Sequence, residues 1–244
     1  MNLITEHNIQ LVIFDMDGVL TQTARLHAQA WKKMFDEYLQ KREGDNFKPL
    51  KIETDYKEYI DGIPRFEGVR AFLNSRDIAL PEGSPQDYPD QKTIYGLGMR
   101  KNALFLDLLE KEGIHVYEDT LEIIKDLKKD KIKMAAISSS KNCQAIIEKA
   151  GLSHYFDAIV GGITSEKEDI KGKPAPDIFL YASKQIDIAP DKAMVIEDAI
   201  SGVKAGKDGK FALVVGVARN NDKDNLREAG ADIVVQKLTE LKTK

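Results

Sequence analysis

Two carboxylates at the end of an apolar run are the residues best suited to chemistry in this chain. Asp15 and Asp17 follow the apolar residues 11–14, and such a run is typical of a strand buried on both faces. In parallel sheets ligands bind beyond the carboxyl ends of the strands. Residues two apart share a face, and Gly18 permits a sharp turn, so the pair could serve as a nucleophile beside an acid/base. The alternative is an ordinary polar turn.

Other apolar runs also end in polar groups. Residues 134–137 lead into Ser138, and residues 193–196 lead into Glu197 and Asp198. Between them, Lys173 precedes two prolines that can hold its loop in a defined shape. We therefore expect these side chains to meet at one edge of a sheet. For Glu197 and Asp198 a simple helix cap is the alternative.

These motifs, in this order, resemble those of a known family. The Asp-Met-Asp-Gly segment at 15–18, the Ser/Lys loop at 138–142, the Lys-Pro-Ala-Pro-Asp segment at 173–177 and the Glu-Asp pair at 197–198 are similar to the four motifs of the haloacid dehalogenase superfamily. Closer matches at residues 15–31, 140–142 and 173–179 resemble its β-phosphoglucomutase branch. The resemblance is weak between about residues 32 and 98.

The resemblance implies a catalytic role for each core residue. Asp15 would attack a phosphoryl group, Asp17 would be the general acid/base, and Ser138 and Lys173 would bind the phosphoryl oxygens. Since a carboxylate and a phosphate repel each other, a divalent cation must bridge them, and Mg²⁺ prefers such oxygen ligands. The implied metal ligands are Asp15, Asp17 through its backbone carbonyl, Asp198, and Glu197 as an alternate ligand or a residue behind the ligands.

The same resemblance implies substrate-binding residues outside the core motifs. His27 would restrain Asp17 until substrate is present, Arg65 would grip a distal phosphate, and Lys101 would contact substrate. Trp31, four residues after His27 on a predicted helix, would lie beside the sugar. The alternatives are a packed histidine, a core tryptophan and an exposed arginine. The remaining residues of the predicted distal-phosphate site, at a helix start, are Ser140, Lys141 and Asn142.

Composition limits the class of protein. The 244 residues can bury a substantial core, and 36 basic against 40 acidic residues give a net charge of −4 with no basic stripe, which argues against nucleic acid as a partner. No apolar run approaches the ~18 residues that span a bilayer, so we expect no membrane partner and a cytoplasmic location. We also expect a monomer. The chain has a single cysteine, Cys143, which is typical of a protein in a reducing compartment. We interpret Cys143 as a packed thiol rather than a nucleophile.

Strand-like and helix-like segments alternate along most of the chain. Strands are expected near residues 11–14, 134–137, 158–160, 193–196, 212–217 and 232–235, with helices between them at 120–128, 142–150, 177–185 and 199–207. This alternation predicts an α/β fold, a doubly wound Rossmann-like core with a largely parallel sheet. Residues 23–110 have helical stretches at 24–39 and 101–109 but no clear strand, so they form a predicted helical cap, or lid, inserted after the first strand. The predicted core is residues 1–22 and 111–244.

The predicted function is a Mg²⁺-dependent phosphosugar isomerase that interconverts β-glucose 1-phosphate and glucose 6-phosphate through an aspartyl phosphate and a bisphosphate. Its partner would be a small phosphorylated sugar. A phosphatase of the same fold would use the same core residues and differ only in how its lid handles water. A catalytically silent sugar-phosphate binder is the third alternative, although such a protein would be expected to lose one of these acids.

Overall fold

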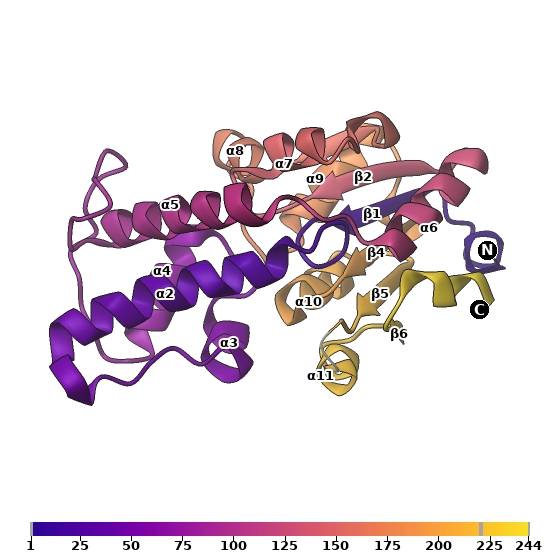
Figure 1. The fold of residues 1–244 in the computed structure, drawn as a ribbon. Helices are drawn as coiled ribbons and strands as arrows, with labels where there is room; N and C mark the ends of the chain where they lie inside the picture. The colour runs from indigo at the N-terminus through magenta and orange to yellow at the C-terminus, as the bar shows by residue number, and fades with distance from the viewer. Residues whose placement is uncertain (1, 220–221, 244) are drawn as a thin grey trace. The chain divides into compact units, whose positions relative to one another are not determined.

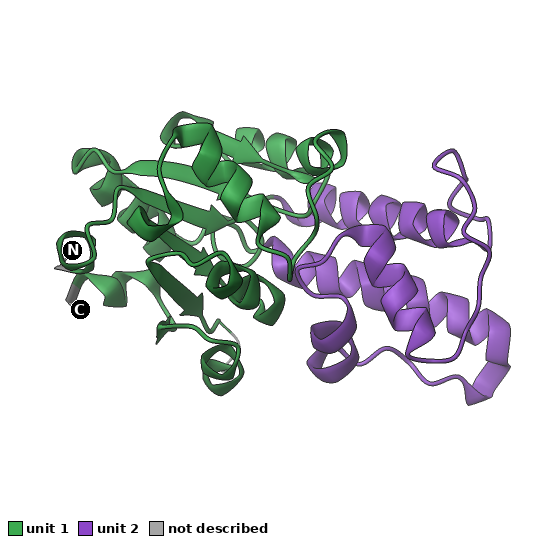
Figure 2. Ribbon diagram, turned by 180° about the vertical axis from the view of Figure 1, so that it is seen from behind, with its two compact units in different colours: residues 1–22, 114–244 green, residues 23–113 purple. Residues whose placement is uncertain are grey.

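The computed structural model describes residues 2–219 and 222–243, and the chain divides into two compact units (Figure 2). Unit 1 is residues 1–22 and 114–244, and unit 2 is residues 23–113. The sequence placed the second boundary after residue 110, but helix α5 (Ile94–Glu112) continues past that position. It ends where Gly113 adopts a positive φ of 77°, which favours glycine after a helix.

Unit 1 is built on a parallel sheet (Figure 1). Within the described residues the sheet has six strands in the order β3-β2-β1-β4-β5-β6. This order confirms the predicted Rossmann-like α/β fold. The strands are β1 (Leu11–Asp15), β2 (Lys133–Ile137), β3 (Ala158–Val160), β4 (Ala193–Glu197), β5 (Leu213–Val217) and β6 (Ile233–Val235).

Helices connect and cover these strands. Each predicted helix of the core is present within one or two residues of its expected ends. The α-helices of unit 1 are α1 (Asn2–Glu6), α6 (Glu118–Lys129), α7 (Cys143–Lys149), α8 (Gly162–Lys167), α9 (Asp177–Ile186), α10 (Ile200–Asp208) and α11 (Lys223–Glu228), and its 3₁₀ segments are η3 (Ser153–Tyr155), η4 (Pro190–Lys192) and η5 (Leu238–Thr243).

Both faces of the central strand are buried. Leu11 and Ile13 pack into a core cluster with Phe179 of α9 and Val203 of α10. Val12 and Phe14, which point to the opposite face, are equally inaccessible to solvent. Burial on both faces explains the unbroken apolar run in the sequence.

Strand register brings the polar strand ends to one edge. Strand β1 lies between β2 and β4, with Asp15 opposite Ile137 and Phe14 opposite Ile196. Glu197, the last residue of β4, is therefore level with Asp15, and Ser138 lies one position beyond that level, directly after β2. The parallel sheet thus brings Asp15, Ser138 and Glu197 to its carboxyl edge.

Unit 2 is helical and has its own core. Aromatic side chains from α2 and α4 meet there: Trp31 stacks on Phe35, with ring centroids 5.5 Å apart, and Phe35 contacts Phe72. Its elements are α2 (Thr23–Glu43), η1 (Gly44–Asn46), the π-helix η2 (Ile52–Tyr56), α3 (Lys57–Tyr59), α4 (Arg65–Asn74) and α5.

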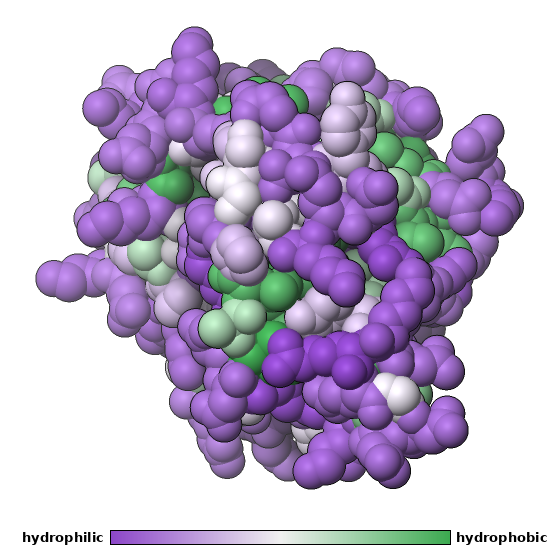
Figure 3. Space-filling view, turned by 90° about the vertical axis from the view of Figure 1, so that its left-hand side faces the viewer, coloured by the Kyte–Doolittle hydropathy of each residue, from purple (hydrophilic) through white to green (hydrophobic). Residues whose placement is uncertain are grey.

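The surface has the character expected of a charged chain. On the face drawn in Figure 3, hydrophilic residues predominate and hydrophobic ones lie in groups between them. Among the described residues, no helix combines the length and the apolar character needed to cross a bilayer.

Candidate active site

A buried lysine between two carboxylates lies at the centre of the predicted site. The Nζ atom of Lys173 donates to Asp15 Oδ1 at 2.5 Å and also to Glu197 Oε1. The second oxygen of Glu197 accepts the backbone N–H of Ala199 at 2.7 Å. All three side chains are buried. Lys173 is held in a loop turned by a hydrogen bond from Ala175 N–H to the Gly172 carbonyl.

The charges of this group explain its pKa shifts. Burial raises the pKa of Asp15 well above its usual value, against the opposing attraction of Lys173. Burial would lower the pKa of Lys173, but the carboxylates of Asp15 and Glu197 outweigh it and hold that pKa above its usual range. Two buried carboxylates, those of Asp15 and Glu197, thus share the single positive charge of Lys173. Such a group favours binding of a further positive charge.

Asp17 lies in the turn that follows β1. Its Oδ2 accepts a hydrogen bond of 2.9 Å from the hydroxyl of Ser138, and the Ser138 Oγ accepts the backbone N–H of Ser140. The structure therefore brings together the predicted acid/base and a predicted phosphate-binding hydroxyl. Both come from loops at the carboxyl edge of the sheet.

Gly18 brings the turn close to Asp198. Gly18 has a φ of +89°, and a Cβ built there would lie 1.8 Å from Asp198 Oδ2. Glycine is thus required for its backbone conformation and for the space that the carboxylate occupies. The Asp198 carboxylate consequently packs directly against the loop that carries Asp17.

The predicted metal ligands fit a magnesium ion in part. Among the residues that the structure describes, no three His, Cys, Asp or Glu side chains converge as a ready-made metal site. Both oxygens of Glu197 are engaged, by Lys173 and by Ala199, which favours the second of its two expected roles, a residue behind the ligands. Asp15 and Asp198, with the Asp17 carbonyl, remain an all-oxygen donor set. Mg²⁺ commonly takes few protein oxygens and keeps several waters.

The predicted distal-phosphate loop precedes α7. The Ser140 hydroxyl accepts the Asn142 backbone N–H at 3.2 Å, and the Ser140 carbonyl accepts two backbone N–H groups, so this loop is internally ordered. Lys141 makes an exposed ion pair of 2.7 Å with Glu166. To bind a phosphate, Lys141 would have to leave that pair.

Two of the predicted substrate residues of unit 2 contact each other. Lys101 Nζ lies 2.6 Å from His27 Nδ1, and the His27 ring stacks on Phe105 with centroids 3.9 Å apart. The Lys101 side chain is buried, and its nitrogen is 5.2 Å from the ring centroid of Trp31. Because an ammonium group only donates hydrogen bonds, Nδ1 is the acceptor and the histidine proton belongs on Nε2.

The other two predicted residues of unit 2 differ in their surroundings. Trp31 is only 4% exposed and belongs to the core of the unit, which favours packing over contact with a sugar. Arg65 donates to Asn102 Oδ1 at 2.7 Å. Burial lowers the pKa of Arg65 to about 10, so it stays charged at neutral pH. Gly98 of α5 leaves room for Phe66, beside Arg65.

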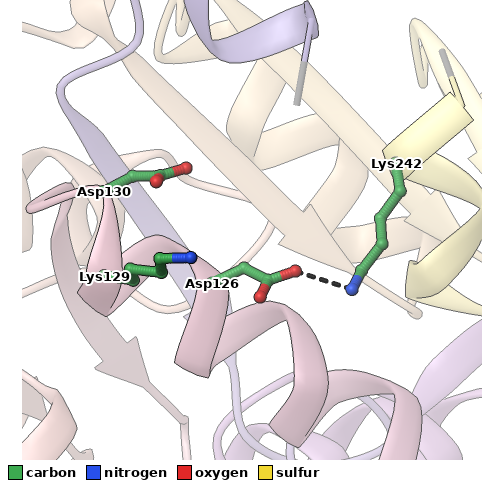
Figure 4. A pocket seen from close by; sticks show the side chains of 4 residues that line it. All are labelled: Asp126, Lys129, Asp130 and Lys242. Atoms are coloured by element: carbon green, nitrogen blue, oxygen red, sulfur yellow. Dashed lines mark ion pairs between the residues drawn. The ribbon is translucent and has the colours of Figure 1, made fainter.

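A pocket elsewhere in unit 1 contains none of these residues (Figure 4). It is lined by Asp126, Lys129 and Asp130 at the end of α6 and by Lys242 of η5. Lys242 makes exposed ion pairs with Asp126 and Glu122. These pairs tie η5 to α6 and have no place in the predicted chemistry.

The sequence reasoning missed three residues that support the site. Arg219 donates to the Gly18 carbonyl, and Thr120 donates to the Val19 carbonyl. A Cβ at Gly202 would lie 1.8 Å from Glu197 Oε1, so this glycine gives the buried carboxylate its space. Only Gly202 had a sequence signal, as a glycine early in a helix just after the Glu-Asp pair. Arg219 and Thr120 lie about a hundred residues or more from the loop they contact.

Comparison with known proteins gives concordant similarities. The family model described as haloacid dehalogenase-like hydrolase matches residues 9–210. The chain is 44% identical over 239 residues to a β-phosphoglucomutase of Mycobacterium tuberculosis (strain CDC 1551 / Oshkosh), covering 96% of this chain and 91% of the relative. It is 30% identical to a phosphorylated carbohydrates phosphatase of Thermotoga maritima, covering 93% of this chain and 94% of that protein. The crystal structure of a β-phosphoglucomutase from Clostridium difficile has a TM-score of 0.73 and 26% identity, covering 96% of this chain and 93% of that one.

Proposed function

Because the chain belongs to the haloacid dehalogenase-like hydrolase family, we propose that it is a Mg²⁺-dependent isomerase that interconverts β-glucose 1-phosphate and glucose 6-phosphate. Its relatives establish the coarser description, an enzyme of the phosphotransferase type that acts as a phosphosugar mutase or phosphatase. The identity of the sugar and the isomerase activity are the proposal.

One observation carries the proposal. The buried carboxylate of Asp15 pairs with the buried ammonium group of Lys173, and a second carboxylate, that of Asp17, lies in the turn that follows. Asp15 is held by Lys173, and Asp17 is held by Ser138. Lys173 is in turn held by Glu197, which points it at the phosphoryl oxygens that Asp15 would receive. A preorganised cation in a water-poor site stabilises charge that develops on a transferring phosphoryl group.

The proposed reaction has two half-steps. In the first, an Asp15 oxygen bonds to the phosphorus of a sugar bisphosphate, the bond from phosphorus to the sugar oxygen breaks, and Asp17 gives that oxygen its proton. In the second, Asp17 takes the proton of a sugar hydroxyl, whose oxygen then receives the phosphoryl group and frees Asp15. A bound Mg²⁺ would offset the repulsion between the Asp15 carboxylate and the phosphoryl oxygens.

Residues of unit 2 would determine whether a sugar hydroxyl or water receives the phosphoryl group from Asp15. Lys101 fixes the tautomer and orientation of His27, so the pair presents one defined N–H donor. Asn102 fixes Arg65, whose charged guanidinium suits the phosphate that does not react. Binding energy from that remote phosphate would close the lid and exclude water from the aspartyl phosphate.

The test compares isomerisation with hydrolysis. We expect β-glucose 1-phosphate, primed with a trace of glucose 1,6-bisphosphate, to give glucose 6-phosphate much faster than it gives inorganic phosphate. Arg65→Ala should lower this ratio, whereas Arg42→Ala, which removes an exposed arginine at the end of α2, should leave it unchanged. Phosphate release that outruns isomerisation on every glucose phosphate would favour a phosphatase, the activity named for the Thermotoga maritima relative.

A further inference from the structure

Arg219 follows β5 and lies outside the four sequence motifs, yet its guanidinium group makes several polar contacts. Its guanidinium donates to Asp119 Oδ2 at 2.8 Å and to the Gln236 carbonyl at 3.1 Å. It also lies 3.9 Å from the ring centroid of Tyr117. Arg219 and Asp119 are largely buried, with side-chain exposures of 12% and 13%. A planar guanidinium held by a carboxylate and an aromatic ring has a fixed orientation.

The remaining donors of Arg219 point toward the loop after β1. Its Nε donates to the Gly18 carbonyl at 3.4 Å, and one Nη donates to the hydroxyl of Thr120 at 3.1 Å. That hydroxyl donates its own proton to the Val19 carbonyl at 2.7 Å. Two successive carbonyls are therefore held, one by Arg219 directly and one through Thr120.

This loop sets the geometry of the proposed acid/base. Residues 16–21 form a tight turn in which Gly18 N–H bonds to the Thr21 carbonyl at 2.8 Å and Thr21 N–H bonds to the Met16 carbonyl at 2.9 Å. Asp17 lies inside the turn, and Gly18 touches the carboxylate of Asp198. A shift of the turn would therefore move Asp17 and alter its spacing from Asp198.

We propose that Arg219 is a positioning residue for phosphoryl transfer, which holds the turn at residues 16–21 from outside and so aims the carboxylate of Asp17. The proposal rests on the proposed function for its kinetic consequence, but the hold on the turn is a property of the protein without substrate. A misplacement of about 1 Å at a reacting group can cost a hundredfold in rate.

Four variants separate this role from simple stabilisation. Arg219→Gln removes the guanidinium, and Thr120→Val removes only the bridging hydroxyl from a residue with no solvent exposure. Thr120→Ser restores that hydroxyl. Arg227→Gln is the control, because Arg227 pairs with Asp224 on α11 and is 59% exposed.

Hydrogen exchange measured by mass spectrometry on the protein without substrate is the first readout. Loss of hydrogen bonds to a charged donor should speed exchange at the amides of Gly18, Leu20 and Thr21 by about ten- to a hundredfold in Arg219→Gln. Thr120→Val should act in the same direction, and Thr120→Ser and Arg227→Gln should resemble the parent. Amides of β2 and α9 should keep their rates, since a general loss of stability would speed those as well.

Kinetics are the second readout. Arg219→Gln and Thr120→Val should lower kcat by about ten- to a hundredfold with little change in KM, because the substrate contacts are intact and only the acid/base is misplaced. Unchanged exchange in the turn, or equal acceleration throughout unit 1, would overturn the proposal. If Arg219→Gln does not fold, the Thr120 pair decides alone. A parent protein that turns over no sugar phosphate would overturn the proposed function, and the exchange data would still decide the role of Arg219 in holding the turn.

Discussion

Replacing Lys173 by Met should destabilise the protein more than any exposed charge substitution. Methionine keeps the length of the side chain and its contact with Phe179, whose ring centroid lies 5.3 Å from the Lys173 nitrogen. It removes the cation that forms an ion pair with both Asp15 and Glu197. Breaking a buried ion pair by removing one member costs about 3–5 kcal/mol. For a chain of this size we expect a fall in Tm of roughly 6–20 °C.

The physical reason can be tested separately from the loss itself. If the cost comes from the stranded Glu197 charge, then Glu197→Gln in the Lys173→Met background should recover about 1–3 kcal/mol, the range of coupling seen between contacting residues. The glutamine oxygen can still accept the Ala199 N–H that Glu197 accepts now. Urea unfolding of the four members of this double-mutant cycle measures the coupling directly.

A lysine on the surface provides the control. Lys207 pairs with Asp232 at 2.6 Å, but its side chain is 40% exposed. Lys207→Met should therefore change the free energy of unfolding by no more than about 1 kcal/mol. Additive effects of the Lys173 and Glu197 substitutions, or a Lys173→Met protein as stable as the Lys207→Met protein, would refute the charge argument.

Three further perturbations test other parts of the site. Asp17→Asn should slow phosphoryl transfer by about 10²- to 10⁴-fold while Mg²⁺ titrations stay unchanged, because the proposed metal contact is its backbone carbonyl; a collapse in Mg²⁺ affinity would make its carboxylate a ligand. Gly18→Ala, whose Cβ would overlap the Asp198 carboxylate, should raise the Mg²⁺ concentration for half-maximal activity about tenfold. Gly151→Ala, with a similar positive φ but open space around it, should not. Burial raises the pKa of the Cys143 thiol above its usual value, so the thiol stays protonated at neutral pH and iodoacetamide should label it more than about tenfold more slowly in native than in denatured protein; equal rates would contradict this.

The sequence predicted the core well because burial leaves a strong trace in residue types. A central strand covered on both faces must be apolar throughout, and β1 and β4 have no exposed residue. Because β1 pairs in parallel with both β4 and β2, the register alone brings Asp15 level with Glu197 and within one position of Ser138. The contact between Lys173 and Asp15 could be expected from the resemblance, but the second contact with Glu197 could not. The sequence at residue 197 is the same whether this glutamate binds a metal or pairs with a lysine, so it cannot distinguish the two roles.

What the sequence could not supply are the contacts between residues far apart in the chain. Trp31 has the helical spacing of a residue beside His27, yet its face of α2 turns into the core of unit 2. Arg219 lies 201 positions from Gly18, in no pattern of hydrophobic residues or charges. The proposed role of Arg219 depends on hydrogen-bond acceptors that only the folded chain brings together around its guanidinium group. A site of this kind is therefore predictable from sequence where it is made of strand ends. It is not predictable where it is made of the side chains that hold those ends in place.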